Sequence, residues 1–331
     1  MYLAPLPLLD VRRLSIAYVT SAERVPAVRD VSLKILEGET LALAGETGSG
    51  KSTLGLAISG LLDSRANVES GEIRFEENSL RSLSDRGWRR IHGRKIGIIF
   101  QDARSALNPV LTIKDHLVET ILAHQKISRK EAQARALSLL KDVGIPEGHE
   151  KLHPFELSGG MCQRVGIALA ICNSPRLLIA DEPTSSLDST IQAQILDLLL
   201  LMKQRYGLAL LLISHDLALI SQVADRISVM YHGRIVESGP REEVFTSPAH
   251  PYTQNLIHCL AGLQHHHEAA PLTPVPGVVP APGENFPGCA FAPRCRYLEQ
   301  ACRQTIPAVR EVSDTHSVAC FCDLAGMRDK R

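Results

Sequence analysis

A glycine-rich stretch near the start of the chain has the residue types and spacing that hold a phosphate chain. It fits the pattern G-x-x-x-x-G-K-[ST] and consists of Gly45, Glu46, Thr47, Gly48, Ser49, Gly50, Lys51 and Ser52. Glycines let the backbone wrap closely around an anion, the lysine reaches the outer phosphates, and the serine hydroxyl is a ligand for Mg²⁺. An apolar run precedes the stretch and a helical run follows it, as a P-loop between strand and helix requires. The sequence therefore predicts a P-loop.

Two adjacent carboxylates follow a short apolar run further along the chain. The run 177–180 is typical of a buried strand and ends at Asp181 and Glu182. One carboxylate at the end of such a strand can bind Mg²⁺, and its neighbour can polarise a water molecule. We expect Asp181 to bind the metal ion and Glu182 to act as general base. A solvated acidic loop is the alternative, and the P-loop upstream argues against it.

A second anion-binding motif lies between these two. Ser158, Gly159 and Gly160 precede a helical run at 164–171. Backbone N–H groups at a helix start, together with a serine hydroxyl, form a site for an anion. The chain therefore has two separate helix starts that favour phosphate.

Together these motifs resemble those of the nucleotide-binding subunits of ABC transporters. In that family, the Ser-Gly-Gly signature of one subunit closes over the nucleotide at the P-loop of its partner, so that two subunits enclose two ATP molecules. The resemblance implies that Gln101 touches Mg²⁺ or water and that His215 contacts the γ-phosphate. It also implies that Asp188 lies in a loop at the dimer interface, and it adds Thr53 to the nucleotide-binding residues. Tyr18 would stack on adenine, with an ordinary core or surface tyrosine as the alternative.

The elements around these motifs alternate between strands and helices, which predicts a mainly parallel sheet covered by helices. The resemblance makes this an α/β P-loop core of ABC type, with a RecA-like subdomain, an antiparallel β subdomain and a helical subdomain at about residues 102–170. Expected strands lie at 14–19, 31–35, 40–44, 70–75, 95–100, 177–180 and 208–214, the fourth and fifth returning to the sheet, and expected helices run to about 62, over 113–143 and over 191–204.

Charge and hydropathy exclude some classes of function. The 36 basic residues balance 36 acidic ones, so overall charge gives no support to a general role in binding nucleic acid. No apolar run approaches the roughly 18 residues that span a bilayer, and residues 1–10 lack the order of a secretory signal. We expect a protein at the cytoplasmic face of the cell (inner) membrane, attached peripherally through its partners.

Composition changes near residue 264. The run 265–267 is three histidines, which we interpret as a solvated linker, and a proline-rich segment follows. Such a proline density cannot continue a helix or a central strand. We therefore expect a nucleotide-binding domain at 1–263 and a proline-rich linker with a cysteine module at 264–331.

Four cysteines of this tail, Cys289, Cys295, Cys302 and Cys320, have a spacing similar to the C-terminal module of oligopeptide and dipeptide importer ATPases. In those relatives four cysteines bind a [4Fe–4S] cluster. Thiolates also bind zinc, although the spacing lacks the paired C-x₂-C of common zinc sites. Cys322 competes as the fourth ligand, and unligated cysteines in a mobile tail are the remaining alternative.

Two further segments, 101–113 and 250–253, resemble tracts of the same importers. The resemblance implies an ATP-hydrolysing subunit that energises uptake of di- and oligopeptides. Its partners would be two transmembrane permeases, a second, homologous ATPase and, indirectly, an extracytoplasmic solute-binding protein, with no nucleic acid. An import ATPase for nickel or another small solute is one alternative, and a redox-sensing regulatory subunit is another. A non-transport ABC ATPase acting on nucleic acid or ribosomes is disfavoured, because the chain has one P-loop, one signature and no long heptad run.

Overall fold

The computed structural model describes residues 6–20, 23–185, 187–264, 277–281 and 283–324. Ser186, the histidine run 265–267 and the proline-rich segment up to residue 276 lie outside the described residues. Within the described part of the chain, no helix is long and apolar enough to cross a membrane.

Two sheets carry the fold in the described residues. The main sheet has the strand order β11-β12-β10-β9-β3-β8-β7-β6, and the second has the order β2-β1-β4-β5. The strands are β1 (Leu9–Val19), β2 (Arg24–Ile35), β3 (Thr40–Ala44), β4 (Ala66–Phe75), β5 (Asn78–Ser79), β6 (Ile96–Ile99), β7 (Leu177–Asp181), β8 (Ala209–Ser214), β9 (Arg226–Tyr231), β10 (Arg234–Pro240), β11 (Arg310–Glu311) and β12 (Ser317–Val318).

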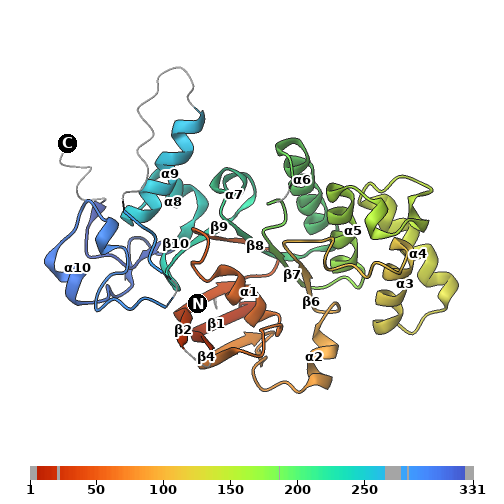
Figure 1. Ribbon diagram of the computed structural model, residues 1–331, viewed down its shortest axis with the longest axis horizontal. Coiled ribbons are helices and arrows are strands. Elements are labelled where there is room, and N and C mark those ends of the chain that lie inside the picture. The colour runs from red at the N-terminus through yellow and green to blue at the C-terminus, as the bar shows by residue number, and fades with distance from the viewer. Residues whose placement is uncertain (1–5, 21–22, 186, 265–276, 282, 325–331) are drawn as a thin grey trace, which may run out of the picture.

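The centre of the main sheet is parallel and fully enclosed. Strand β3 pairs in parallel with β8 and β9, and β7 pairs in parallel with β8 and β6. Every residue of β3 and β8 is buried, as expected for a parallel sheet with both faces covered. Helices α6 and α7 lie on one side of the sheet, and α1 with the second sheet lies on the other (Figure 1). The carboxyl ends of β3, β8, β7 and β6 therefore meet at one edge, where ligands bind in such folds.

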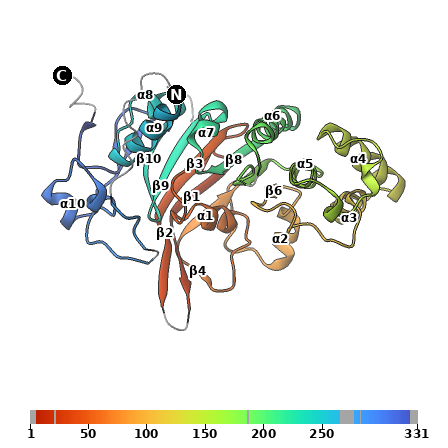
Figure 2. The same ribbon diagram turned by 45° about the horizontal axis from the view of Figure 1, so that its top comes forward.

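The helices are mostly short and capped by side chains. Their bounds are α1 (Lys51–Ile58), α2 (Asp85–Ile91), α3 (Ile113–His124), α4 (Arg129–Asp142), α5 (Gly159–Ile171), α6 (Ser189–Tyr206), α7 (Leu217–Val223), α8 (Arg241–Thr246), α9 (Pro251–Gln264) and α10 (Gln300–Gln304), with 3₁₀ turns η1 (His149–Lys151), η2 (Pro154–Glu156) and η3 (Ala292–Arg294). Helices α3 and α4 lie at one end of the long axis and α10 lies at the other (Figures 1 and 2).

Two expectations from the sequence are wrong in detail. The helical run 113–143 is two helices, because Ser128 and Glu131 form a capping box that starts α4 anew after an extended Gln125. The expected strand at 70–75 belongs to the second sheet, where β4 pairs with β1, and does not return to the main sheet.

The C-terminal tail joins the main sheet and does not stand apart from it. Strand β12 pairs with β10, with Val318 opposite Glu237. The buried carboxylate of Glu237 accepts a hydrogen bond from His316 at 2.8 Å. Phe291 of the tail is 1% exposed and packs against Tyr231 and Tyr252 of the core. The tail therefore packs along the edge of the main sheet, while the boundary expected near residue 264 stays a prediction.

Candidate active site

The P-loop connects β3 to α1 with three glycines in the left-handed region. Their φ angles are 146° at Gly45, 82° at Gly48 and 102° at Gly50. A Cβ atom on Gly45 would lie 2.2 Å from the carbonyl oxygen of Met230, and one on Gly50 would lie 2.2 Å from that of Ala27. Glycine is therefore required at these two positions. Gly50 precedes α1 without a side-chain cap, so the first N–H groups of the helix face the loop.

Lys51 is buried beneath the loop that it follows. Its ammonium donates hydrogen bonds to the carbonyl oxygens of Gly45 at 2.7 Å and Glu46 at 2.9 Å. Burial lowers the pKa of Lys51, and the nearby carboxylates of Glu182, Asp181 and Glu46 oppose that effect. The phosphates of a nucleotide would be charged acceptors for the Lys51 ammonium, and charged acceptors bind an ammonium more strongly than carbonyl oxygens do.

Ser52 and Asp181 join the P-loop to the end of β7. The hydroxyl of Ser52 donates a hydrogen bond to Oδ1 of Asp181 at 2.9 Å. Burial raises the pKa of Asp181, and the negative charge of Glu182 raises it further. The hydrogen bond from Ser52 and the positive charge of Lys51 oppose this rise. A hydroxyl and a carboxylate side by side are hard oxygen ligands of the kind Mg²⁺ takes. The donor set therefore fits the predicted metal ion.

Glu182 and His215 lie in direct contact. Nδ1 of His215 is 2.8 Å from Oε1 and 2.9 Å from Oε2 of Glu182. Glu182 has a φ of 46°, in the left-handed region that non-glycine residues rarely adopt, and its N–H donates to the carbonyl of Ile213 at 2.9 Å. Such backbone strain is concentrated at functional sites. The sequence named both residues separately, and the fold brings them together at the ends of β7 and β8.

Gln101 and Tyr18 belong to different sheets, since Gln101 follows β6 of the main sheet and Tyr18 lies on β1 of the second. Gln101 follows β6 and is exposed at the same edge as the ends of β7 and β8. Tyr18 on β1 is half-buried, and its hydroxyl is 3.3 Å from the hydroxyl of Thr53 on α1. The second sheet is therefore attached directly to the helix that follows the P-loop.

The Ser-Gly-Gly motif caps α5 and packs against the start of α6. The hydroxyl of Ser158 accepts a hydrogen bond from the N–H of Met161 at 3.3 Å. A Cβ on Gly160 would lie 2.9 Å from Ile191, whose N–H is bound by the capping carboxylate of Asp188 at 3.0 Å. In Figure 1, α5 lies beyond β7 and β6 from α1. Signature and P-loop thus lie apart along the same molecule.

Glu46 of the P-loop contacts two residues to which the sequence assigned no role. Its N–H donates to the hydroxyl of Tyr252 at 2.8 Å, and its carboxylate accepts two hydrogen bonds from Arg294 at 2.8 and 3.0 Å. Tyr252 lies in the 250–253 segment and Arg294 lies in the tail. In the sequence analysis these segments indicate only the resemblance to peptide-importer ATPases. Nothing in the local sequence of either residue points to the P-loop.

The tail cysteines gather on one small pocket. Its lining includes Cys289, Cys295, Cys302, Cys320 and Cys322. Burial raises the pKa of the Cys289 thiol, that of Cys295 to about 11 and that of Cys320 to about 12. In the described part of the chain, no group of three or more His, Cys, Asp or Glu side chains is arranged to hold a metal ion. Cysteine thiolates are the right kind of ligand for a cluster, but the described side chains are not arranged to hold a metal ion. The [4Fe–4S] cluster therefore stays a prediction, and no catalytic step is attributed to it.

The fold and the site together define an ATPase domain of P-loop type. The ABC transporter family model matches residues 28–185, and the model described as oligopeptide/dipeptide transporter, C-terminal region, matches residues 236–302. The dimeric, post-hydrolysis structure of the ATP-binding cassette MJ0796 with ADP and Pi is similar, with a TM-score of 0.64 and 30% identity over 70% of this chain and 98% of that one.

Curated relatives are similar over nearly their whole length. The dipeptide transport ATP-binding protein DppD of Bacillus subtilis is 44% identical over 316 residues, which cover 95% of this chain and 94% of that protein. The DppD protein of Escherichia coli is 41% identical over 315 residues, covering 95% and 96%. A putative peptide import ATP-binding protein of Brucella melitensis is 42% identical over 327 residues, covering 95% and 97%.

The chain belongs to the oligopeptide/dipeptide importer family of ABC transporter ATP-binding subunits. The predicted α/β cassette fold and the predicted ATPase activity are thereby confirmed. Membership of this family also implies permease partners that span the membrane.

Proposed function

We propose that this chain binds ATP with Mg²⁺ at the P-loop and hydrolyses it to drive the import of di- and oligopeptides. The observation that carries the proposal is the hydrogen bond of 2.9 Å between Ser52 and Asp181, which joins the two halves of the site. The printed names of the relatives, dipeptide and peptide transport or import ATP-binding proteins, support the substrate class.

Each side chain has a separate role in this proposal. Lys51 exchanges its carbonyl partners for the outer phosphates, and the glycine backbone surrounds them. Ser52, Asp181 and Gln101 would hold Mg²⁺, which neutralises charge on the phosphates. Glu182 takes the proton of the attacking water, and His215 holds that carboxylate in place at 2.8 Å. Tyr18 would stack on adenine.

The separation of the signature from the P-loop supports a site shared between two subunits. Ser158, Gly159 and Gly160 would bind the nucleotide at a partner's P-loop, and Asp188 beside them would lie at the interface. We propose a heterodimer with a second, homologous ATPase at the cytoplasmic face of the membrane. Residues 102–170, which contain α3 and α4, would form the helical subdomain that docks the permeases.

Replacing the proposed base tests the hydrolytic site. Glu182→Gln keeps the shape of the side chain but cannot accept the proton of water. Phosphate release should fall by about 100-fold or more, while ATP binding persists. Glu147→Gln, an exposed glutamate, is the matched control and should hydrolyse normally. Normal turnover by Glu182→Gln would remove Glu182 from the catalytic role.

Partners and cargo can be tested by isolating the complex. Tagged Glu182→Gln chain, held closed by ATP and Mg²⁺ in gently solubilised membranes, should co-purify with two permeases and a second ATPase. Uptake of labelled dipeptides by cells carrying the complex, and not of nickel, identifies the cargo. Recovery of ribosomes or nucleic-acid-binding proteins alone would overturn the transporter assignment.

We also propose that the tail cysteines hold a [4Fe–4S] cluster. The shared pocket of five cysteines supports this, and Cys289, Cys295, Cys302 and Cys320 would be the ligands. Chain purified without oxygen should contain about four iron and four sulfide per molecule and absorb visible light. Zinc, or no metal, in such a preparation would contradict the cluster. The division into 1–263 and 264–331 belongs to the same proposal.

A further inference from the structure

A charged residue of the tail reaches into the P-loop. Arg294 ends the 3₁₀ turn η3, directly before Cys295, and is 5% exposed. Its Nη1 lies 2.8 Å from Oε2 of Glu46 and its Nη2 lies 3.0 Å from Oε1. A guanidinium paired with a carboxylate through two parallel hydrogen bonds is a geometrically specific contact.

Glu46 is consequently held at three points. Arg294 binds its carboxylate, Tyr252 accepts from its N–H at 2.8 Å, and Lys51 donates to its carbonyl at 2.9 Å. Glu46 is the residue immediately after the first P-loop glycine. The path of the loop over the phosphate site is therefore fixed partly by residues far outside the motif.

The surroundings of Arg294 make the ion pair strong. Its guanidinium carbon is 5.8 Å from the ring centres of both Tyr231 and Phe291, and its Nη1 is 3.3 Å from the hydroxyl of Tyr231. Tyr252 packs against both of these rings. Aromatic burial lowers the local dielectric, which strengthens a paired charge and makes an unpaired one costly.

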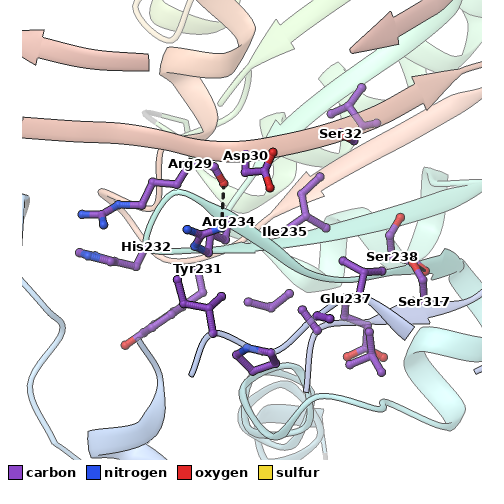
Figure 3. Close-up of a pocket in the computed structure, with 18 of the residues that line it drawn as sticks. Arg29, Asp30, Ser32, Tyr231, His232, Arg234, Ile235, Glu237, Ser238 and Ser317 are labelled. Carbon is purple, nitrogen blue, oxygen red and sulfur yellow. Dashed lines mark hydrogen bonds between the residues drawn. The ribbon is translucent and has the colours of Figure 1, made fainter. Parts of the chain in front are cut away.

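A groove lies beside the tail, and neither Arg294 nor Glu46 is among the residues that line it. It has a volume of about 1070 Å³ and is bordered by the second sheet, by β9 and β10, and by the tail. Figure 3 shows Tyr231 and His232 on its wall beside Arg29 and Arg234. The tail thus contacts the rest of the chain at two different places, through Arg294 at the P-loop and through β12 at β10.

We propose that Arg294 is a positioning residue for the nucleotide, so that the affinity of this site for ATP depends on the C-terminal tail. Arg294 favours ATP binding in two ways. It restrains the loop through Glu46, and it neutralises a carboxylate that would otherwise repel the incoming phosphates. The inference rests on the proposed binding of ATP at this P-loop.

The test is the Kd of Mg-ATP for the full-length Glu182→Gln chain, measured by displacement of trinitrophenyl-ATP. Arg294→Gln should weaken binding about tenfold. Arg294→Lys keeps the charge but cannot form the two parallel hydrogen bonds, so its Kd should lie between those of the parent and of Arg294→Gln. The combined Glu46→Gln and Arg294→Gln change removes the unpaired carboxylate and should recover affinity to within about threefold of the parent.

Arg296→Gln is the matched control, because Arg296 lies two residues further on and bonds Gln254 instead of the P-loop. It should bind ATP as the parent does. In the otherwise unsubstituted chain, Arg294→Gln should raise KM for ATP and leave kcat unchanged, which a merely structural defect would not do. An Arg294→Gln Kd within twofold of the parent, or a double change as weak as the summed single ones, would overturn the proposal.

Should Arg294→Gln fail to fold, amide exchange of residues 45–52 in Arg294→Lys and Glu46→Gln decides the matter. Faster exchange confined to this loop is expected, and unchanged exchange would overturn the proposal. Failure of the parent chain itself to bind ATP would overturn the proposed function first, so the two outcomes are distinguishable.

Discussion

His250 shows how burial changes the chemistry of a single side chain. It is 1% exposed, and its Nδ1 accepts the N–H of Tyr252 at 3.0 Å, so the neutral ring carries its proton on Nε2. Nε2 is buried and has no hydrogen-bond partner among the described residues. Burial lowers the pKa of His250 to about 4, against the attraction of Glu237. The ring is therefore held neutral at the junction of core and tail.

This histidine predicts a loss of stability in acid. An unfolded histidine titrates near 6.5, so below that pH the unfolded chain binds a proton that the native chain refuses until about pH 4. The contribution of His250 to the free energy of unfolding is present well above pH 6.5, and on the order of 2 kcal/mol of it should be lost by pH 5. Urea unfolding at pH 7.5 and 5.0 measures it.

His250→Gln should remove this part of the pH slope, whereas His258→Gln, at an exposed site on α9, should keep it. An unaltered slope in His250→Gln would place the acid sensitivity elsewhere.

Ser52 gives a second prediction for a single side chain. Its hydroxyl both donates to Asp181 and would bind the metal ion. Ser52→Ala should raise the Mg²⁺ concentration for half-maximal hydrolysis about tenfold. Ser59→Ala is a control on the turn after α1, since that hydroxyl bonds only helix carbonyls in the described structure. Equal Mg²⁺ dependence in parent and Ser52→Ala would exclude Ser52 as a ligand.

Among the elements of the fold, the P-loop turn requires glycine where a Cβ atom would clash with the neighbouring backbone. Gly50→Ala would place its Cβ 2.2 Å from the carbonyl oxygen of Ala27 at a φ of 102°. We expect a loss of about 2–4 kcal/mol in unfolding free energy, measured in urea. Gly48→Ala has a similar φ of 82° but nothing within 4 Å, so it should cost about 1 kcal/mol. Equal losses would mean that strain alone, without the clash, requires glycine.

Local sequence predicted the elements whose signals are local. Strand β3 was expected at 40–44 and lies there, because a short apolar run ends at a turn. The break before α4 is not apparent from glycine or proline, which are absent there, because it is the capping box of Ser128 and Glu131 that starts a new helix. The partner of β4 was wrong because a β-rich run does not specify the strand with which it pairs.

The candidate site follows the same division. Short motifs predict the P-loop residues and the residues at the ends of β7 and β8, because each motif spans only a few positions. The contact between Glu182 and His215 joins the ends of two strands, and the contact between Glu46 and Arg294 joins residues 248 apart in the chain. No spacing rule reaches that far, so only the fold could show these pairs.

At the scale of the whole molecule, cassette and tail share one core. Phe291 is 1% exposed between Tyr231 and Tyr252. Phe291→Ala should lower the unfolding free energy by about 3–5 kcal/mol, measured in urea. Phe321→Ala truncates the same residue type in the same tail at 37% exposure and should cost about 1 kcal/mol. Similar costs would show that the tail does not share the core.

The order in which the chain is made gives the tail contact a further consequence. The ribosome releases the P-loop long before Arg294, which follows Glu46 by 248 residues. At typical rates of synthesis that interval lasts roughly 10 to 50 s. Until Arg294 and β12 emerge, β10 lacks its pairing with β12 and Glu46 lacks its ion pair with Arg294. The proposed role of Arg294 therefore predicts that a nascent or truncated cassette without this residue binds ATP weakly, and that the affinity rises once the tail has folded against the P-loop.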